Sequence, residues 1–546
     1  MQKKWAILTS IVAVGALLSG CSTGNNGQQA NQSKEKSLNF VVQQEMPTAD
    51  LSLASDTVSF TALNNVYEGL YRQDKNNELV LAGAAEKPQV SQDGLTYTFK
   101  LRQDAKWSNG DPVKAQDYVY GWQRTVNPKT ASQYAYLFSA IENGKETNAG
   151  TKAVSDLGIK AVGDYELEIK LSQAIPYFER LLTLPTFFPQ NQKVVEQYGK
   201  DYAINSDSAV YNGPYVLKDF SGPGTDDAWT YAKNDNYWDK NAVNLDSINV
   251  SVVKDSSTAL NLFKNNQADD IVLTGELAQQ NRNDEAYQSI LQATTQYLEF
   301  NQRDSNSVFK NENLRKAISY SIDRKALTES ILGNGSMPSS GFVPRNIMKS
   351  PDGKDFTDVV GNYLNEDANQ AKTYWEKAKQ ELGITTLNFS ILSSDTDASK
   401  KIIEYLQNAI QTNLEGVKVN LTPVPFSVRL DRAAAGNFDL LMGSYGADYL
   451  DASSFSDLLK SGVSYNRGQW SSAEYDRLVN AASTTDIKDA QKRFNDLVSA
   501  EKIVMSQQGV APLYQAVEAH MINPKIKNYA AHPAGAKFDY KWLSVE

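Results

Sequence analysis

The sequence predicts an α/β fold built from several structural units. After about residue 300, short apolar strands alternate with amphipathic helices, which is typical of an α/β domain. Before that point, segments with a strict two-residue alternation of apolar and polar residues indicate half-buried strands. The chain has 546 residues, which is enough for roughly two to four domains of ordinary size.

Elements of the N-terminal half follow from their residue patterns. The first strand is expected at 38–42, which reads Leu-Asn-Phe-Val-Val. A helix is expected over 57–70, because apolar residues recur there at every third or fourth position. Strands are expected at 95–101 and 165–171, where apolar and polar side chains alternate. This half is therefore a mixed structure of strands and helices.

Elements of the C-terminal half alternate in type. Apolar residues at helical spacing predict helices around 314–322 and 403–410. Short apolar runs at 387–392, 417–421 and 438–442 predict buried strands. We therefore expect an α/β C-terminal half, with a cleft between the two halves.

Composition favours a binding protein over an enzyme. The formal net charge of −10 argues against a nucleic-acid partner, which requires a basic face. His520 and His532 are the only histidines in the sequence, and Cys21 is the only cysteine. Neither a Gly-x-Ser-x-Gly elbow nor a Gly-rich phosphate loop is present. We expect no catalytic residues, no metal and no cofactor.

The first residues resemble a bacterial lipoprotein signal. Lys3 and Lys4 precede an apolar run over 5–18, which is followed by Ser-Gly and Cys21. The resemblance implies a signal peptide over 1–20, diacylation (palmitate) of Cys21 and anchoring at the outer face of the cell membrane. An ordinary secretory signal that happens to end in cysteine is the alternative. Residues 21–36 have almost no apolar content and are expected to form a disordered tether.

Four segments together resemble the oligopeptide-binding (OppA-like) solute-binding lipoproteins of peptide ABC transporters. The first is Ala-Lys-Trp-Ser-Asn-Gly-Asp-Pro-Val at 105–113, with its continuation to 122. The second combines Tyr-Asn-Gly-Pro-Tyr at 211–215 with Lys-Asn-Asp-Asn-Tyr-Trp-Asp at 233–239. The others lie at 313–324 and 438–449. The resemblance runs from about residue 38 to the end, in the family's order and spacing.

This resemblance implies a two-lobed, periplasmic-binding-protein-like (Venus flytrap) fold of the large peptide-binding type, with an extra N-terminal subdomain. The expected hinge strands lie near 297–301 and 512–519. The expected boundaries are lobe I at 37–67, 205–300 and 519–546, the extra subdomain packed on lobe I at 68–204, and lobe II at 301–518.

Asp448 is the principal candidate for a ligand contact. It follows the short apolar segment 438–442 and lies among small residues, where a ligand can approach the backbone closely. The resemblance implies that this aspartate pairs with the α-ammonium group of a bound peptide. The alternative is a loop aspartate that caps a helix within 451–459.

Further contacts are implied by the resemblance alone. Main-chain hydrogen bonds to an extended peptide would come from two segments, in the manner of β-augmentation. Tyr134 matches a tyrosine that reaches the ligand backbone, Phe426 an aromatic residue that lines the cleft, and Tyr445 a site often held by Trp. For Phe426 and Tyr445, core packing is the alternative. The two main-chain segments are Ser55, Asp56 and Thr57 on one side and Gly443, Ser444, Tyr445 and Gly446 on the other.

One departure from the family bears on ligand length. Family members that prefer short peptides carry basic groups for the terminal carboxylate, and the ten residues before Asp448 contain none. The nearest basic residues are Arg429 and Arg432. We therefore hypothesise a loosely read carboxylate and a preference for longer peptides, signalling peptides among them.

The expected function is that of an extracellular receptor, a monomer on a Gram-positive cell, which delivers oligopeptides to an ABC permease. A receptor of the same fold for nickel, haem or an oligosaccharide is the first alternative, because one fold serves several ligands. A surface hydrolase is a weaker alternative. The sequence does not separate an importer subunit from a peptide sensor.

Overall fold

The computed structural model describes residues 36–222 and 227–546, and residues 36–546 form one compact unit. The expected signal peptide, Cys21 and the tether up to residue 35 lie outside the described residues. Lys36 is already part of the fold, because its N–H donates to Asp246 Oδ2 at 2.8 Å. Among the described residues, no helix combines the length and the apolar character that a membrane span requires.

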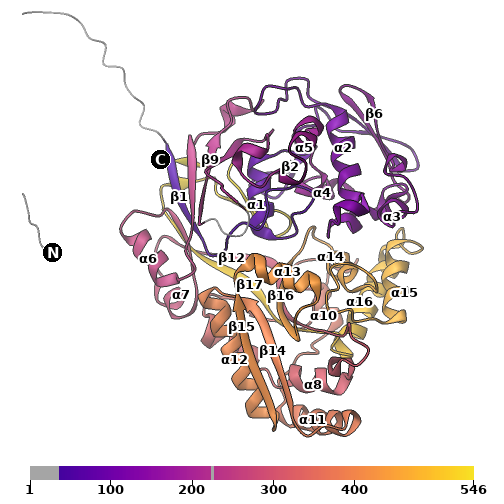
Figure 1. Cartoon of the computed structure of the whole chain (residues 1–546), viewed down its shortest axis with the longest axis vertical. Coiled ribbons are helices and arrows are strands. Elements are labelled where there is room, and N and C mark those ends of the chain that lie inside the picture. Colours follow the sequence, from indigo (N-terminus) through magenta and orange to yellow (C-terminus); the bar gives the residue numbers. More distant parts are fainter. Residues whose placement is uncertain (1–35, 223–226) are drawn as a thin grey trace, which may run out of the picture. The chain divides into compact units, whose positions relative to one another are not determined.

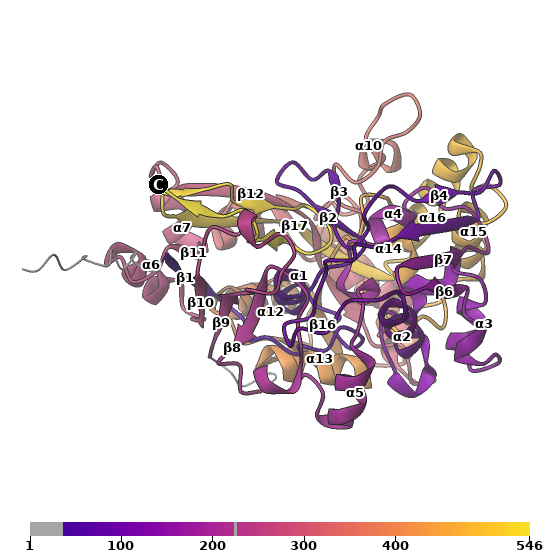
Figure 2. The same ribbon diagram turned by 90° about the horizontal axis from the view of Figure 1, so that it is seen from above.

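The largest sheet among the described residues has eleven strands and mixes parallel with antiparallel pairs. Figure 2 shows β11, β1, β10, β9 and β8 one after another, in agreement with their pairing. Across the sheet the order is β15 (Val417–Val424), β14 (Leu387–Ser394), β16 (Leu440–Gly446), β12 (Tyr287–Phe300), β17 (Val510–Ile522), β11 (Asp270–Leu273), β1 (Ser37–Val42), β10 (Ser247–Val252), β9 (Ala228–Lys233) and β8 (Tyr215–Lys218), and β13 (Met337–Pro338) pairs with β17.

Two long antiparallel strands, β12 and β17, connect the two sides of this sheet. β17 pairs with β11 through Ala519–Ile522, and β12 pairs with β16 through Thr294–Phe300. We call β1 and β8–β11 the β1 side, and β14–β16 the β14 side. The expected hinge segments near 297–301 and 512–519 fall in β12 and β17, with Asn301 one residue beyond the end of β12.

The β14 side is a layered α/β structure, as the sequence predicts. Helix α12 (Asp397–Asn413) packs on β14 and β15, and α8 (Glu312–Tyr320) packs on α11 (Ala368–Leu382) (Figure 1). The apolar stripe of α12 is buried, with Ile403, Leu406 and Ile410 at most 1% exposed. The helices expected around 314–322 and 403–410 are confirmed, as are the three strands expected between 387 and 442.

A second, antiparallel sheet lies within residues 68–204. The strands expected at 95–101 and 165–171 are confirmed as β5 (Thr96–Lys100) and β7 (Glu166–Lys170), which pair with each other. The buried apolar residues of this region belong to the same hydrophobic core as those of β1 and α1, and the proposed lobe boundaries remain a prediction. The other strands of the sheet are β4 (Gln89–Val90) and β6 (Ile159–Gly163), and the helices of the region are α2 (Ala115–Val126), α3 (Gly144–Asn148), α4 (Phe178–Leu181) and α5 (Gln192–Tyr198).

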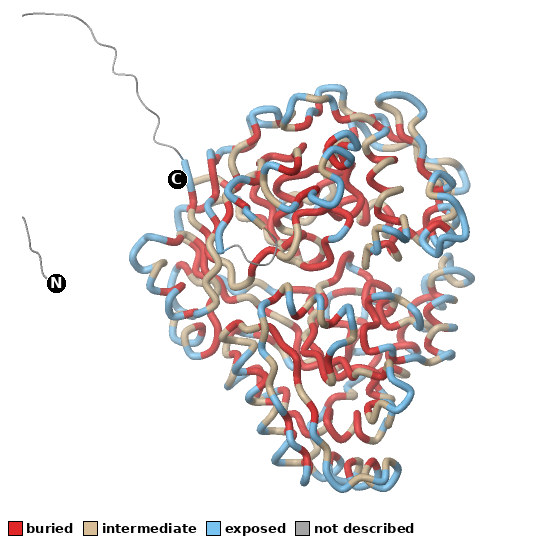
Figure 3. The backbone as a smooth tube through the Cα atoms, in the orientation of Figure 1, coloured by how far each residue is buried: buried red, intermediate tan, exposed pale blue. Residues whose placement is uncertain are grey.

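Helix α1 (Thr57–Val66) is shorter than the expected 57–70. Asp56 begins it as the N-cap, because its Oδ1 accepts the Ser59 N–H at 2.8 Å. The backbone becomes extended at Tyr67, which ends the helix. Tyr67 and Leu70 are nevertheless buried, so the apolar spacing continues into a packed loop. Figure 3 shows that the chain is mostly buried in the part of the molecule where Figure 1 places α1.

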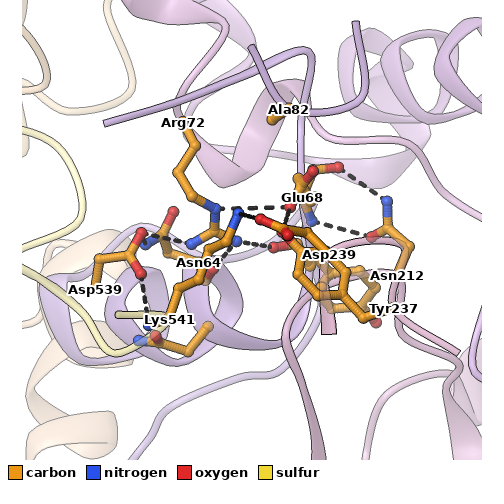
Figure 4. A network of polar contacts seen from close by, with 12 residues as sticks. Asn64, Glu68, Arg72, Ala82, Asn212, Tyr237, Asp239, Asp539 and Lys541 are labelled. Atoms are coloured by element: carbon orange, nitrogen blue, oxygen red, sulfur yellow. Dashed lines mark hydrogen bonds and ion pairs between the residues drawn. The ribbon is translucent and has the colours of Figure 1, made fainter. Parts of the chain in front are cut away.

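A buried polar network joins α1 to the C-terminal segment. Arg72 lies 3.7 Å from Glu68, and its Nη1 contacts Asp539 Oδ2 at 2.5 Å. Lys541 pairs with Asp239 at 2.8 Å in the same network (Figure 4). Buried charges require such partners. The network therefore ties together chain segments that are far apart in the sequence, beside the sheet that carries β1.

Candidate functional site

A cavity of about 300 Å³ lies between the β1 side and the β14 side. Its walls come from segments within 40–61 and 229–250 on one side and within 394–402 and 426–448 on the other. Tyr514, Val517 and Glu518 of β17 contribute to the wall between them. The cavity is of the size that small-molecule and peptide sites have, and it adjoins the two strands that connect the sides.

Asp448 lines this cavity and is 6% exposed. Three tyrosine hydroxyls donate to its carboxylate: Tyr445 at 2.5 Å and Tyr136 at 3.5 Å to Oδ2, and Tyr134 at 3.2 Å to Oδ1. Among the residues that the structure describes, no cation pairs with it. The buried carboxylate is therefore held in place by neutral donors and still lacks a counter-charge.

Burial dominates the titration of this carboxyl group. Desolvation raises the pKa of Asp448 to about 7, and the hydrogen bonds from Tyr445, Tyr134 and Tyr136 lower it only in part. A cation that entered the cavity beside Asp448 would favour its ionised form. The alternative role as a helix cap is not found, because Ser453 N–H donates to Asp451 and Asp448 N–H donates to Ser454 Oγ at 2.9 Å.

The main-chain segment at the end of β16 has an edge that no strand covers. β14 pairs with β16 only at Leu440 and Leu441, and no other described strand pairs with Gly443–Gly446 on that side. Gly446 lies close to the start of α1, because a Cβ atom placed on it would be 3.7 Å from Thr57 Cγ2. An extended peptide could therefore find backbone partners at β16, beside the segment that begins α1.

Helix α13 (Phe426–Ala435) brings Phe426 and Arg429 to the cavity wall. Phe426 N–H donates to Glu45 Oε1 at 2.6 Å, so a carboxylate from the β1 side satisfies the first turn of α13. The Arg429 guanidinium lies 4.9 Å from the centre of the Phe426 ring. One helical turn thus presents an aromatic ring and a cation together.

At another part of the wall, the charges are mutually paired. His520 Nδ1 lies 2.7 Å from Asp270, Tyr529 donates to the same carboxylate at 2.6 Å, and Lys537 pairs with Glu518. Burial lowers the pKa of His520, but Asp270 and Glu518 outweigh it and raise the value to about 10. This cluster is balanced and needs no ligand for its charge.

Most of the sequence-predicted residues come together at this one cavity. Gly443 is the exception, since the missing side chain faces Tyr297 and Glu299 of the neighbouring strand β12. The residues that line the cavity are Ser55, Asp56, Thr57, Tyr134, Phe426, Ser444, Tyr445, Gly446 and Asp448.

Sequence reasoning missed two important side chains. Tyr136 completes the hydroxyl cage of Asp448, and its place two residues after Tyr134 was the only available signal. Arg429 stands 19 residues before Asp448, outside the ten-residue stretch in which a basic group was sought, yet it lines the same cavity. The ten residues before Asp448 contain no basic group, but the cavity does, and the hypothesis of a loosely read carboxylate with a preference for longer peptides stays a prediction.

No group of three or more His, Cys, Asp or Glu side chains in residues 36–222 and 227–546 is arranged to hold a metal ion. The buried polar atoms of the cavity include Asp56 Oδ2 and Arg429 Nε, which have no hydrogen-bond partner among these residues. The cavity-lining residues Trp229 and Thr294 also have an unpaired buried atom each, Nε1 and Oγ1, so the charged members of this set are a carboxylate oxygen and a guanidinium nitrogen.

Comparisons with known proteins agree with this geometry. The chain is 35% identical to a dipeptide-binding protein of Lactococcus lactis subsp. cremoris, over 99% of both chains. Its structure matches that of Listeria monocytogenes OppA bound to peptide with a TM-score of 0.91 and 42% identity, over 94% of this chain and 99% of the other. It matches the pheromone receptor PrgZ with a TM-score of 0.90 and 40% identity, over 94% and 100%.

These likenesses establish the two-lobed fold of periplasmic binding proteins, as the sequence predicted. Residues 80–467, more than half of the chain, match the family described as "Bacterial extracellular solute-binding proteins, family 5 Middle". The chain belongs to family 5 of the bacterial extracellular solute-binding proteins.

Proposed function

We propose that this protein is a lipid-anchored extracellular receptor that captures oligopeptides in the cavity between its lobes and delivers them to an ABC permease. The observation that carries the proposal is the buried Asp448 carboxylate, which neutral hydroxyls position and no described cation neutralises. A peptide's α-ammonium group supplies the missing charge. The main-chain edge at Gly443–Gly446 supplies backbone partners for an extended ligand.

Closure of the two lobes over the ligand is the proposed mechanism. Two contacts between the sides support it: Glu45, which follows β1, accepts the Phe426 N–H, and Lys254, which follows β10, contacts Asp395 at 2.8 Å. Lys254 also lies 3.6 Å from Glu45 on its own side. Strands β12 and β17 would carry the hinge motion. Closure must be favourable with ligand yet weak enough for the permease to reopen the receptor.

Native mass spectrometry of the protein as purified tests the peptide ligand directly. We expect mass adducts that denaturation releases and that fragment as peptides. Their lengths would also separate short nutritional peptides from longer signalling peptides, a class that the likeness to PrgZ favours. Release of haem, nickel or an oligosaccharide instead would contradict the proposal in favour of the alternative ligands.

The membrane anchor rests on Cys21 and its flanking sequence. We expect wild-type protein in the membrane fraction of a Gram-positive host, and a Cys21→Ser variant in the culture medium or held as an unprocessed precursor. Metabolic labelling with palmitate should mark only the wild type. Equal membrane retention and no label in either protein would refute lipidation. Peptide binding in solution should be the same in both.

A further inference from the structure

The Arg429 guanidinium is a buried cation that contacts the Phe426 ring but has no anionic or hydrogen-bonding partner in the described protein. Its side chain is 5% exposed and lines the cavity. Neither a hydrogen bond nor an ion pair joins it to any residue in 36–222 or 227–546, and its Nε is buried without a partner. A buried charge of this kind is costly unless something pairs with it.

Every other buried arginine of the described chain has at least one hydrogen bond or ion pair, although the Nε atoms of Arg72, Arg467 and Arg493 also lack a hydrogen-bond partner. Arg493 forms two hydrogen bonds with Asp451, at 2.9 and 2.7 Å. Arg315 and Arg324 donate to several backbone carbonyl oxygens, such as Gln508 O at 2.9 Å and Pro512 O at 2.6 Å. The fold therefore provides partners for buried guanidinium groups elsewhere, and the exception lies on the cavity wall.

The carboxylates that attract Arg429 do not pair with it. Glu299 of β12 attracts it but is paired at 3.3 Å with Arg467, from the segment after α14 (Ser453–Ser456), and Arg467 repels it. Asp56, at the start of α1, attracts it but forms no ion pair with it. The formal charges of these four groups cancel, so the case for an anion rests on guanidinium N–H groups that no described acceptor satisfies.

The position of Tyr465 relates this cation to the amine site. Its ring lies 6.1 Å from the ring of Tyr134 and 5.3 Å from that of Tyr445, the two tyrosines closest to the Asp448 carboxylate. Arg429 and Tyr465 line the same cavity of about 300 Å³ as Asp448. A group bound by Arg429 would therefore lie near the end of the peptide whose ammonium group is at Asp448.

We propose that Arg429 is a specificity-determining residue that binds a ligand carboxylate near the peptide's N-terminus. The carboxylate comes either from an acidic side chain among the first residues or from the chain end of a very short peptide. This inference rests on the proposed peptide-binding function and names the ligand class within it. A planar guanidinium suits a carboxylate because two parallel N–H groups match its two oxygens.

Isothermal titration calorimetry with two pairs of peptides tests the proposal. One arm compares C-terminally amidated alanine tetrapeptides that carry Asp or Asn at the first, second or third position. The other compares dialanine and trialanine as free acids and as amides. In at least one arm we expect the wild-type protein to bind the carboxylate-bearing peptide about tenfold to a hundredfold more tightly. The arm that responds identifies the source of the carboxylate.

The variant Arg429→Gln should abolish that preference while it still binds the neutral peptides. Arg432→Gln is the matched control, because Arg432 lies on the same helix and donates to Asn437 O outside the cavity. Equal wild-type affinity for acid and amide in both arms would overturn the proposal, even if Arg429→Gln failed to fold. So would loss of the preference in Arg432→Gln. Failure of every peptide to bind would instead refute the proposed function.

Discussion

Replacing Asp448 with alanine should weaken the binding of a free peptide by about 2–5 kcal/mol, or about 30-fold to several-thousand-fold. The reason is that the variant leaves the ligand ammonium group buried without its counter-charge. The carboxylate has no other cationic partner among the described residues, so its loss breaks no ion pair of the protein itself. Titration calorimetry of wild type and variant with one peptide measures the effect.

An N-acetylated peptide tests the same ion pair by removing the charge of the ligand instead of that of the protein. Acetylation removes the ammonium charge, so the wild-type protein should lose a similar amount of affinity for it. The two losses should not add, because each removes one partner of the same pair. The control variant is Asp235→Ala, an exposed acid outside the cavity, which should bind like the wild type. Equal wild-type affinity for free and acetylated peptides would exclude the pairing.

The candidate site shows what local sequence can and cannot predict. Asp448 stood out because an apolar strand and small residues precede it, and that local setting is preserved in the structure. The cage around it was hidden, because Tyr134 and Tyr136 lie more than 300 residues earlier in the chain. Only the tertiary packing of the region 68–204 against the loop after β16 brings them together.

Arg429 shows that local sequence also fails to predict contacts between residues that are near each other in the chain. It is close to Asp448 in the sequence, and α13 and β16 intervene between them. In the sequence alone, this intervening helix and strand separate Arg429 from Asp448, although they return the chain to the same cavity.

The helix expected at 57–70 is longer than α1 for a local reason. The apolar spacing continues through Tyr67, where the backbone has already left the helix.

Peptide affinity should fall as the pH is lowered below about 7. In the free protein, burial raises the pKa of Asp448 to about 7, so the carboxyl group is mainly protonated below that value. A bound ammonium group stabilises the ionised form and lowers the pKa in the complex. Below pH 7, binding therefore requires Asp448 to lose a proton. Each further decrease of one pH unit should cost about tenfold in affinity, until the pH reaches the pKa of Asp448 in the complex. Between pH 7 and 5 we expect a loss of about fiftyfold, because the group is already half protonated at pH 7, and calorimetry in matched buffers measures it.

Two variants assign this pH dependence to its source. Asp448→Asn removes the titrating group and should bind weakly with little dependence on pH below 7. Burial also raises the pKa of Asp56, to about 6, and Asp56→Asn retains a side chain that caps α1. The Asp56→Asn variant should therefore keep the loss between pH 7 and 6, where Asp448 titrates, and change only the part below 6. Above pH 8 the peptide amine itself loses its proton, so affinity should decline there as well. An unchanged wild-type affinity from pH 8 to 5 would contradict an ionised Asp448 as the ammonium partner, because a carboxyl buried among tyrosines cannot ionise without this cost.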